Sequence, residues 1–119
     1  MIYTSYFAMV HRVEDKSKLI GIALWPPKGM GDIKCIRQLA PTKEILLRYK
    51  HDYDKNAYIV AYKRDVLSKL DVHKVAKYLD GHILLCYERP EAFCHRHIVA
   101  KWLNDNGYAC EEINWRNQK

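Results

Sequence analysis

The sequence places two cysteines on either side of a short polar segment, with a histidine and an arginine directly after the second cysteine. A thiolate is a strong nucleophile, and a neighbouring cation or a helix N-terminus favours the thiolate form. Cys94 is followed by His95 and Arg96, so we predict that Cys94 is the reactive thiol. Glu88 and His95 are the candidates for proton transfer, because carboxylates and imidazoles are common general acids and bases. The predicted catalytic residues are therefore Cys94, Glu88 and His95.

The same segment also supplies candidate ligand-binding residues. The planar guanidinium of Arg96 suits a phosphate or a carboxylate, which it can bind through two parallel N–H groups. Cys86 is predicted as a second thiol or as a wall of the pocket. Tyr87, Arg12 and Lys28 complete the predicted ligand-binding set, because each of them follows a different predicted strand.

Each of these residues also has a purely structural interpretation, which the sequence leaves open. Cys94 can be a packing cysteine at a strand–helix junction, and His95 can be an ordinary hydrogen-bonded histidine. Arg96 can form an ion pair with Glu88 or Glu91, which would leave no free guanidinium for a ligand.

The cysteine content also bears on metals and on redox state. Cys86, Cys94 and His95 are three soft ligands, but zinc needs a fourth ligand or an open position, and the chain lacks a Cys-x-x-Cys pair. We therefore predict no metal and no cofactor. With Cys35 and Cys110 the chain has four cysteines, and we expect all four to be reduced, because a cytosolic chain with a sizeable core does not need disulfides.

The predicted elements put these residues at a junction between a strand and a helix. An apolar run ending at Cys86 is typical of a strand buried on both faces, and Gly81 and Pro90 bound it. Apolar residues four apart predict an amphipathic helix that ends at Gly107. This helix begins either at Pro90 or near Cys94, and the sequence does not decide between the two.

The remaining elements follow from local composition. Strands are predicted over residues 2–10, 19–24 and 108–113, and an irregular basic loop over residues 25–41. Thr42 is predicted to cap a helix that extends to Tyr53, a second helix covers residues 57–70, and Asp71 caps a third that ends at Gly81.

This order of strands and helices predicts the fold class: a single three-layer α/β domain over residues 1–119, with a mostly parallel sheet of about four strands flanked by helices. In such sheets ligands bind beyond the carboxyl ends of the strands. The segments that follow the strands are therefore expected to converge there, provided that the first two strands do not pair antiparallel.

The cysteine segment also resembles a known family. The pattern Leu85-Cys86-x-Glu88-x-Pro90-x-x-x-Cys94-His95-Arg96 followed by an apolar helix is similar to the domain of unknown function 488 family. Two upstream segments, Leu39-Ala40-Pro41-Thr42 and Tyr62-x-x-x-Val66-Leu67, are similar to it as well. The resemblance implies a small α/β domain of bacteria, archaea and phages that has no settled activity.

Charge and hydropathy limit the class of partner. The net charge of +6 suits an anionic partner, either a small phosphorylated molecule or a nucleic acid that stacks on Trp25 near the basic loop. No apolar run approaches the roughly 18 residues of a membrane span, so we predict a cytoplasmic protein without a membrane partner. The oligomeric state is left open by the sequence.

Three functions remain. The first is an enzyme or binding domain for a small anionic ligand at Cys86–Arg96, in which a cysteine assists the chemistry. The second is a nucleic-acid-associated module that uses the basic loop, and the third is a protein-interaction domain in which the cysteine loop is structural.

Overall fold

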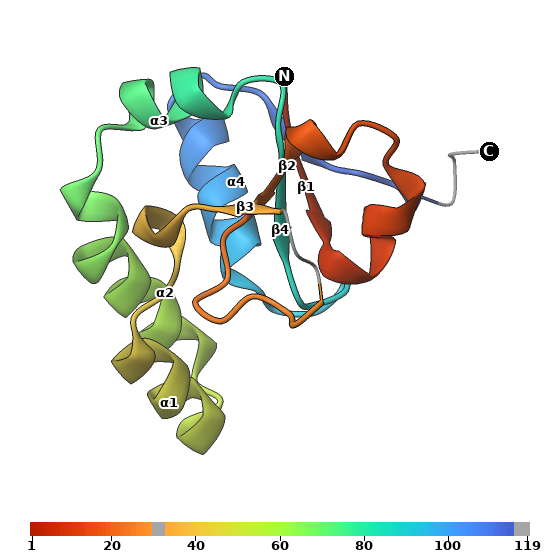
Figure 1. The fold of residues 1–119 in the computed structure, drawn as a ribbon. Coiled ribbons are helices and arrows are strands. Elements are labelled where there is room, and N and C mark those ends of the chain that lie inside the picture. Colours follow the sequence, from red (N-terminus) through yellow and green to blue (C-terminus); the bar gives the residue numbers. More distant parts are fainter. Residues whose placement is uncertain (30–32, 116–119) are drawn as a thin grey trace.

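A parallel sheet of five strands forms the centre of the computed structural model, which describes residues 1–29 and 33–115 (Figure 1). The strand order is β3-β2-β4-β1-β5, and every pair within the described residues is parallel. The strands are β1 (Ile2–Tyr6), β2 (Leu19–Gly21), β3 (Lys34–Cys35), β4 (Ile83–Cys86) and β5 (Cys110–Glu112). The prediction of a mostly parallel sheet is confirmed, with five strands in place of about four.

The sheet is covered on both faces, so the domain has three layers. In Figure 1 all four α-helices lie to one side of the sheet, and the 3-10 helix Phe7–Arg12 lies to the other. The helices are α1 (Lys43–Asp52), α2 (Lys55–Asp65), α3 (Val72–Leu79) and α4 (His95–Asp105). The larger core fills the space under the helices, and a smaller one around Phe7, Leu19 and Leu85 lies under the 3-10 layer.

Side chains at the helix ends explain where the helices begin. The Thr42 hydroxyl accepts a hydrogen bond from the backbone N–H of Ile45, and the Asp71 carboxylate accepts two from the first turn of α3. Both caps confirm the prediction, because such oxygens satisfy N–H groups that have no partner in the helix. Gly107, which follows α4, has φ +88°, a left-handed conformation that glycine adopts without a steric cost.

Four predicted elements have different boundaries in the structure, and one of them is the strand predicted over residues 108–113, which covers only Cys110–Glu112. The strand predicted over residues 2–10 ends at Tyr6, and the one predicted over residues 19–24 ends at Gly21. The helix predicted over residues 57–70 begins earlier, at Lys55, and ends at Asp65. Continuous apolar runs have no period of 2 or 3.6 that would mark the end of an element. Within the loop predicted over residues 25–41, Lys34–Cys35 forms an edge strand, and residues 30–32 lie outside the described part.

Strand β4 lies in the middle of the sheet, so its carboxyl end, at Cys86, lies between the ends of two neighbouring strands. All four of its residues are buried, and it pairs with β1 on one side and with β2 on the other. Because the strands are parallel, Tyr6, Gly21 and Cys86 end at the same edge of the sheet. The chain returns to this edge at Cys94, which is the N-cap of α4. Of the two predicted helix starts, the one near Cys94 is therefore right.

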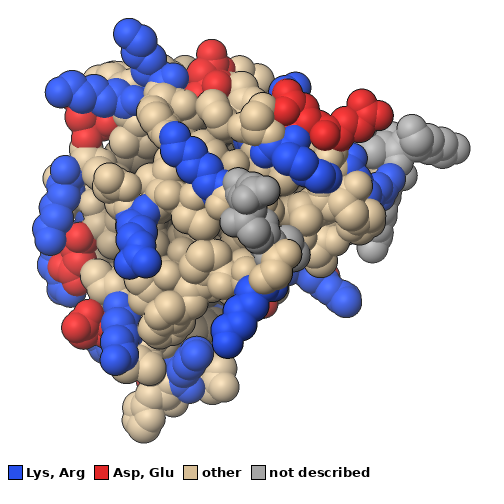
Figure 2. Space-filling model, in the orientation of Figure 1, with Lys and Arg blue, Asp and Glu red and all other residues tan. Residues whose placement is uncertain are grey.

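Two further observations concern the surface. On the face shown in Figure 2, Lys and Arg side chains are spread widely and Asp and Glu side chains lie between some of them. In the described residues, no helix combines the length and the apolar character that a membrane span requires.

Candidate functional site

A pocket of about 320 Å³ opens at the carboxyl ends of the strands and reaches the two cysteines. Five of its lining residues carry a sulfur, an imidazole or a charge, namely Cys86, Cys94, His95, Glu88 and Lys50. Six aromatic side chains line the rest of it, namely Trp25, Tyr49, Tyr53, Tyr58, Tyr87 and Phe93. The site therefore has the form expected of a small-molecule pocket, in which mostly apolar walls surround a few convergent polar groups.

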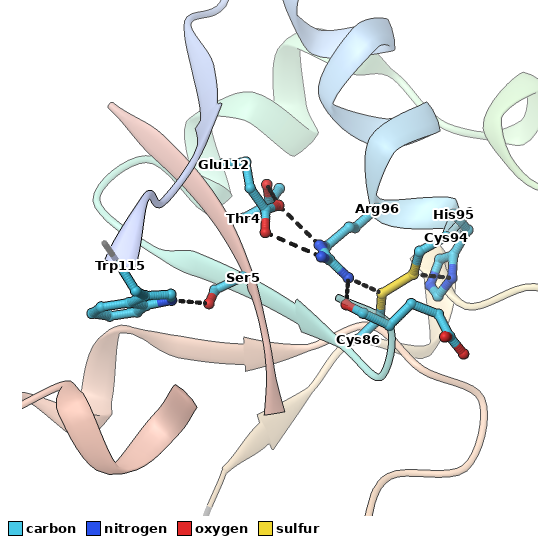
Figure 3. Close-up of polar contacts among 9 residues, drawn as sticks. Thr4, Ser5, Cys86, Cys94, His95, Arg96, Glu112 and Trp115 are labelled. Atoms are coloured by element: carbon cyan, nitrogen blue, oxygen red, sulfur yellow. Dashed lines mark hydrogen bonds and ion pairs between the residues drawn. A yellow bond between two sulfur atoms is a disulfide. The ribbon is translucent and has the colours of Figure 1, made fainter. Parts of the chain in front are cut away.

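The two cysteines are in direct contact. Their Sγ atoms lie 1.93 Å apart and form a disulfide between the end of β4 and the N-cap of α4 (Figure 3). The expectation that all four cysteines are reduced is wrong for this pair. It failed because the parallel sheet returns the chain to the end of β4, which brings together two residues eight positions apart. Cys35 and Cys110 are free thiols, the first exposed and the second buried.

Arg96 lies inside the protein beside this pair, and its side chain is fully buried. Its Nη1 group donates to Sγ of Cys86 at 2.9 Å and to the backbone carbonyl of Glu88 at 2.6 Å (Figure 3). Nε and Nη2 donate to the two carboxylate oxygens of Glu112 at 2.9 and 3.0 Å. The guanidinium thus fixes the loop after β4 and places a positive charge against the Cys86 sulfur.

Glu112 was not among the predicted site residues. It comes from the edge strand β5, and the hydroxyl of Thr4 donates to its Oε1 atom at 2.6 Å. The sequence does contain a signal for it. Residues two apart on a strand share a face, so Glu112 points to the same side as the buried Cys110 and needs a partner there.

His95 is held in one orientation by the backbone of the loop after β2. Its Nε2 atom lies 2.7 Å from the carbonyl oxygen of Ile22, and its Nδ1 atom lies 3.8 Å from Sγ of Cys94. A carbonyl only accepts hydrogen bonds, so we assign the proton of the neutral ring to Nε2 and a lone pair to Nδ1. Burial lowers the pKa of His95 to about 4, although the hydrogen bond to Ile22 acts in the opposite direction.

The sulfurs of Cys86 and Cys94 and a ring nitrogen of His95 lie within 4.8 Å of one another. Together these atoms have the composition of a Cys₂His ligand set, which requires both thiolates and so the reduced protein. The prediction of no metal and no cofactor remains a prediction.

Of the remaining predicted site residues, two line the pocket and two do not. Tyr87 and Glu88 line the pocket, and the Tyr87 hydroxyl donates to the backbone carbonyl of Trp25. Arg12 lies elsewhere, with its guanidinium 5.2 Å from the ring centre of Trp115, beside a wider hollow of about 900 Å³ that contains no cysteine. Lys28 is exposed and is not among the described residues that line the pocket.

The sequence analysis singled out only Tyr87 and Trp25 of the aromatic residues, and the tyrosines of α1 and α2 were not among the predicted site residues. Tyr49 and Tyr58 do pack against Phe93, with ring centres 5.2 and 4.9 Å apart. The same rings also face the pocket. The signal in the sequence was the number of tyrosines, since a core rarely needs so many side chains with a polar end.

The fold and the site together define a class: a small parallel α/β domain with a pocket at the carboxyl ends of its strands and a cysteine pair in the lining of that pocket. The chain belongs to the DUF488 family, because the model of DUF488-N3a, described as the active DUF488-N3 subclade, matches residues 3–107. This confirms the resemblance seen in the sequence. No match was found to a curated protein or to a solved structure.

Proposed function

We propose that the protein is a cysteine-dependent enzyme that binds a small anionic molecule in the aromatic pocket and presents a thiolate of Cys86 to it. The observation that carries the proposal is the 2.9 Å contact between the Arg96 guanidinium and the Cys86 sulfur at the base of an open pocket. A cation in contact with sulfur stabilises the negative charge of the thiolate, and the thiolate is the nucleophilic form.

In this proposal the two cysteines have different roles. The sequence predicted Cys94 as the reactive thiol, but the Arg96 contact favours Cys86. Cys94 faces the unprotonated Nδ1 atom of His95, which can accept a hydrogen bond from its thiol but, with a pKa lowered by burial to about 4, does not take up its proton. Once the disulfide is reduced, the Cys86 sulfur therefore has a cation beside it, whereas the Cys94 thiol has only a hydrogen-bond acceptor beside it.

Positive groups around the pocket support an anionic ligand. Lys50 lines the pocket, and the N-terminus of α4 lies beside it at Cys94 and His95. The unpaired N–H groups and the dipole of a helix N-terminus favour negative charge. Arg96 was predicted to bind the anion directly, but with four donor contacts inside the protein it is better suited to positioning Cys86.

Two other considerations favour an enzyme. The description of the matching family model names an active subclade, and the cytoplasmic location predicted from the sequence would keep the cysteine pair reduced. The alternative of a nucleic-acid module receives no support from the face shown in Figure 2, on which the Lys and Arg side chains are dispersed.

The test compares thiols within one molecule. The reduced protein is treated with iodoacetamide, from which a thiolate displaces iodide, and each cysteine is quantified by peptide mass spectrometry. The reaction is run at about pH 6, and the free, exposed Cys35 serves as the internal reference because the reagent reaches it from solvent. We expect Cys86 to react faster than Cys35, and to do so in a Cys94→Ser variant as well. Labelling of Cys86 no faster than Cys35 in both proteins would rule out the thiolate.

A further inference from the structure

We infer that the molecule bound in the aromatic pocket is a mononucleotide, with its base stacked on the aromatic wall and its phosphate near Lys50. This inference rests on the proposed function, because it names the ligand class of the same pocket. It is argued from the aromatic side chains, from the charges at the rim and from the size of the cavity.

Three of the six aromatic side chains that line the pocket are exposed, whereas Tyr58 belongs to the core and Tyr49 and Phe93 are partly buried against it. Trp25 is 49% exposed, Tyr87 50% and Tyr53 71%, and all three line the pocket. Large aromatic groups in a concave surface offer flat faces for a planar ring, and stacking on such faces accepts every base.

The rings are also held in place before a ligand arrives. The hydroxyl of Tyr87 donates to the Trp25 carbonyl, which ties the loop after β4 to the loop after β2. Phe93 lies edge-on to Tyr58 at 4.9 Å and beside Tyr49 at 5.2 Å. A wall that is already ordered loses little conformational freedom when it binds a ring, so more of the stacking energy appears as affinity.

The charges at the rim match the two ends of a nucleotide. The ammonium of Lys50 lies 6.0 Å from the centre of the Trp25 ring, so a cation accompanies one of the stacking faces. A base stacked on Trp25 would bring its phosphate within reach of this ammonium. Glu88 also lines the pocket, and its carboxylate can accept hydrogen bonds from ribose hydroxyls or from an exocyclic amino group.

The volume of the aromatic pocket limits the size of the ligand that it can hold. Small-molecule pockets range from about 300 to 1,000 Å³, and this one, at about 320 Å³, is at the lower limit. One base, one ribose and one phosphate suit such a volume better than a dinucleotide does. Cys86 and Cys94 at the base of the pocket would then face the inner end of the bound nucleotide.

The test is calorimetric titration of the reduced protein with AMP, GMP, CMP and UMP, and with ribose 5-phosphate and inorganic phosphate as comparators. We expect at least one nucleotide to bind about tenfold or more tightly than ribose 5-phosphate, because stacking adds to the phosphate contact. Trp25→Leu should weaken nucleotide binding by about tenfold and leave ribose 5-phosphate unchanged. Tyr78→Leu is the matched control, since Tyr78 is equally exposed but lies on α3 away from the pocket, and it should change neither affinity.

The outcomes separate this inference from the function on which it rests. If ribose 5-phosphate or phosphate binds as tightly as every nucleotide, the nucleotide is excluded while an anion site stands. If a single-stranded oligonucleotide binds more tightly than any mononucleotide, and does so with a steep salt dependence, the ligand is a nucleic acid and the inference fails. A Cys86→Ser variant that still binds the nucleotide would uphold the ligand class even if the alkylation test excluded the thiolate.

Discussion

The guanidinium of Arg96 contacts both the sulfur of Cys86 and the carboxylate of Glu112, so a single buried cation joins the two. Cys86 ends the central strand β4, and Glu112 lies on the edge strand β5. Strand β1 lies between β4 and β5. The positive charge of Arg96 beside the Cys86 sulfur is therefore balanced by Glu112, which comes from the other side of β1. This relationship leads to two predictions about the site.

The first prediction concerns stability. Replacing Arg96 by Met removes the cation and leaves the carboxylate of Glu112 unpaired, with its side chain only 22% exposed. We expect the free energy of unfolding to fall by about 3 kcal/mol, the lower part of the range for breaking a buried ion pair. Urea denaturation of the reduced protein measures it. The double variant Arg96→Met, Glu112→Leu should recover part of the loss, and a cost below about 1 kcal/mol in the single variant would mean that the pair behaves as a surface pair.

The second prediction concerns the thiolate. A Glu112→Gln variant keeps an oxygen for Thr4 and Arg96 but no longer neutralises the guanidinium, so the negative sulfur of Cys86 should be favoured. Alkylation of Cys86 in the reduced protein should then extend to lower pH than in the wild-type protein. Glu111→Gln makes the same change of charge at an exposed position of the same strand and should leave the profile unchanged. A shift to higher pH in Glu112→Gln would contradict the proposed role of Arg96.

The third prediction concerns acid. The pKa of His95 is lowered by burial from 6.5 to about 4, so in mild acid the unfolded chain binds a proton that the folded protein does not. His95 therefore makes no unfavourable contribution above about pH 6.5. As the pH falls from there towards about 4 it should destabilise the fold, by a total on the order of 3 kcal/mol. Urea denaturation at several pH values measures this slope.

The matched variants for this prediction are His95→Gln and His97→Gln. His95→Gln retains an N–H group for the carbonyl of Ile22 but cannot titrate, so most of the slope should disappear. The pKa of His97 is also lowered, chiefly by its partial burial, so His97→Gln should remove only a smaller part. An unchanged slope in the His95→Gln variant would show that the imidazole does not titrate as its burial requires.

The fourth prediction concerns the helix that carries part of the pocket wall. Thr42 caps α1, on which Tyr49 and Lys50 lie, through a 3.2 Å hydrogen bond from the N–H of Ile45. Thr42→Ala should lower the free energy of unfolding by about 1 kcal/mol, whereas Thr42→Ser keeps the accepting oxygen and should cost less. Urea denaturation of both variants measures the difference, and equal losses would show that the hydroxyl is not the stabilising group.

Local patterns predicted the parts of the fold that depend on local chemistry. Thr42 and Asp71 were recognised as helix caps, because a capping oxygen acts within three residues of itself. The helix after Cys94 was predicted in the same way from its apolar spacing, although its start was left open between Pro90 and Cys94. These predictions needed no knowledge of the sheet.

What failed depended on contacts between distant segments. The strand end at Tyr6 was missed, because the apolar run continues into Phe7, which is buried on the opposite face of the sheet under the 3-10 layer. The partner of Arg96 was sought among nearby acidic residues, whereas the structure supplies Glu112 from sixteen positions later. Strand order decides such pairs, and the sequence pattern does not show strand order.

The position of β5 has a consequence for synthesis. Asn104 holds this strand by donating to the carbonyl of Cys110 and accepting from its N–H group, at 2.9 and 3.0 Å. The chain leaves the ribosome N-terminus first during translation. The cysteine pair and Arg96 therefore emerge before Glu112 does. Until β5 joins the edge of the sheet, the nascent domain lacks the carboxylate that balances its buried cation. Completion of the site therefore waits until β5 has been translated.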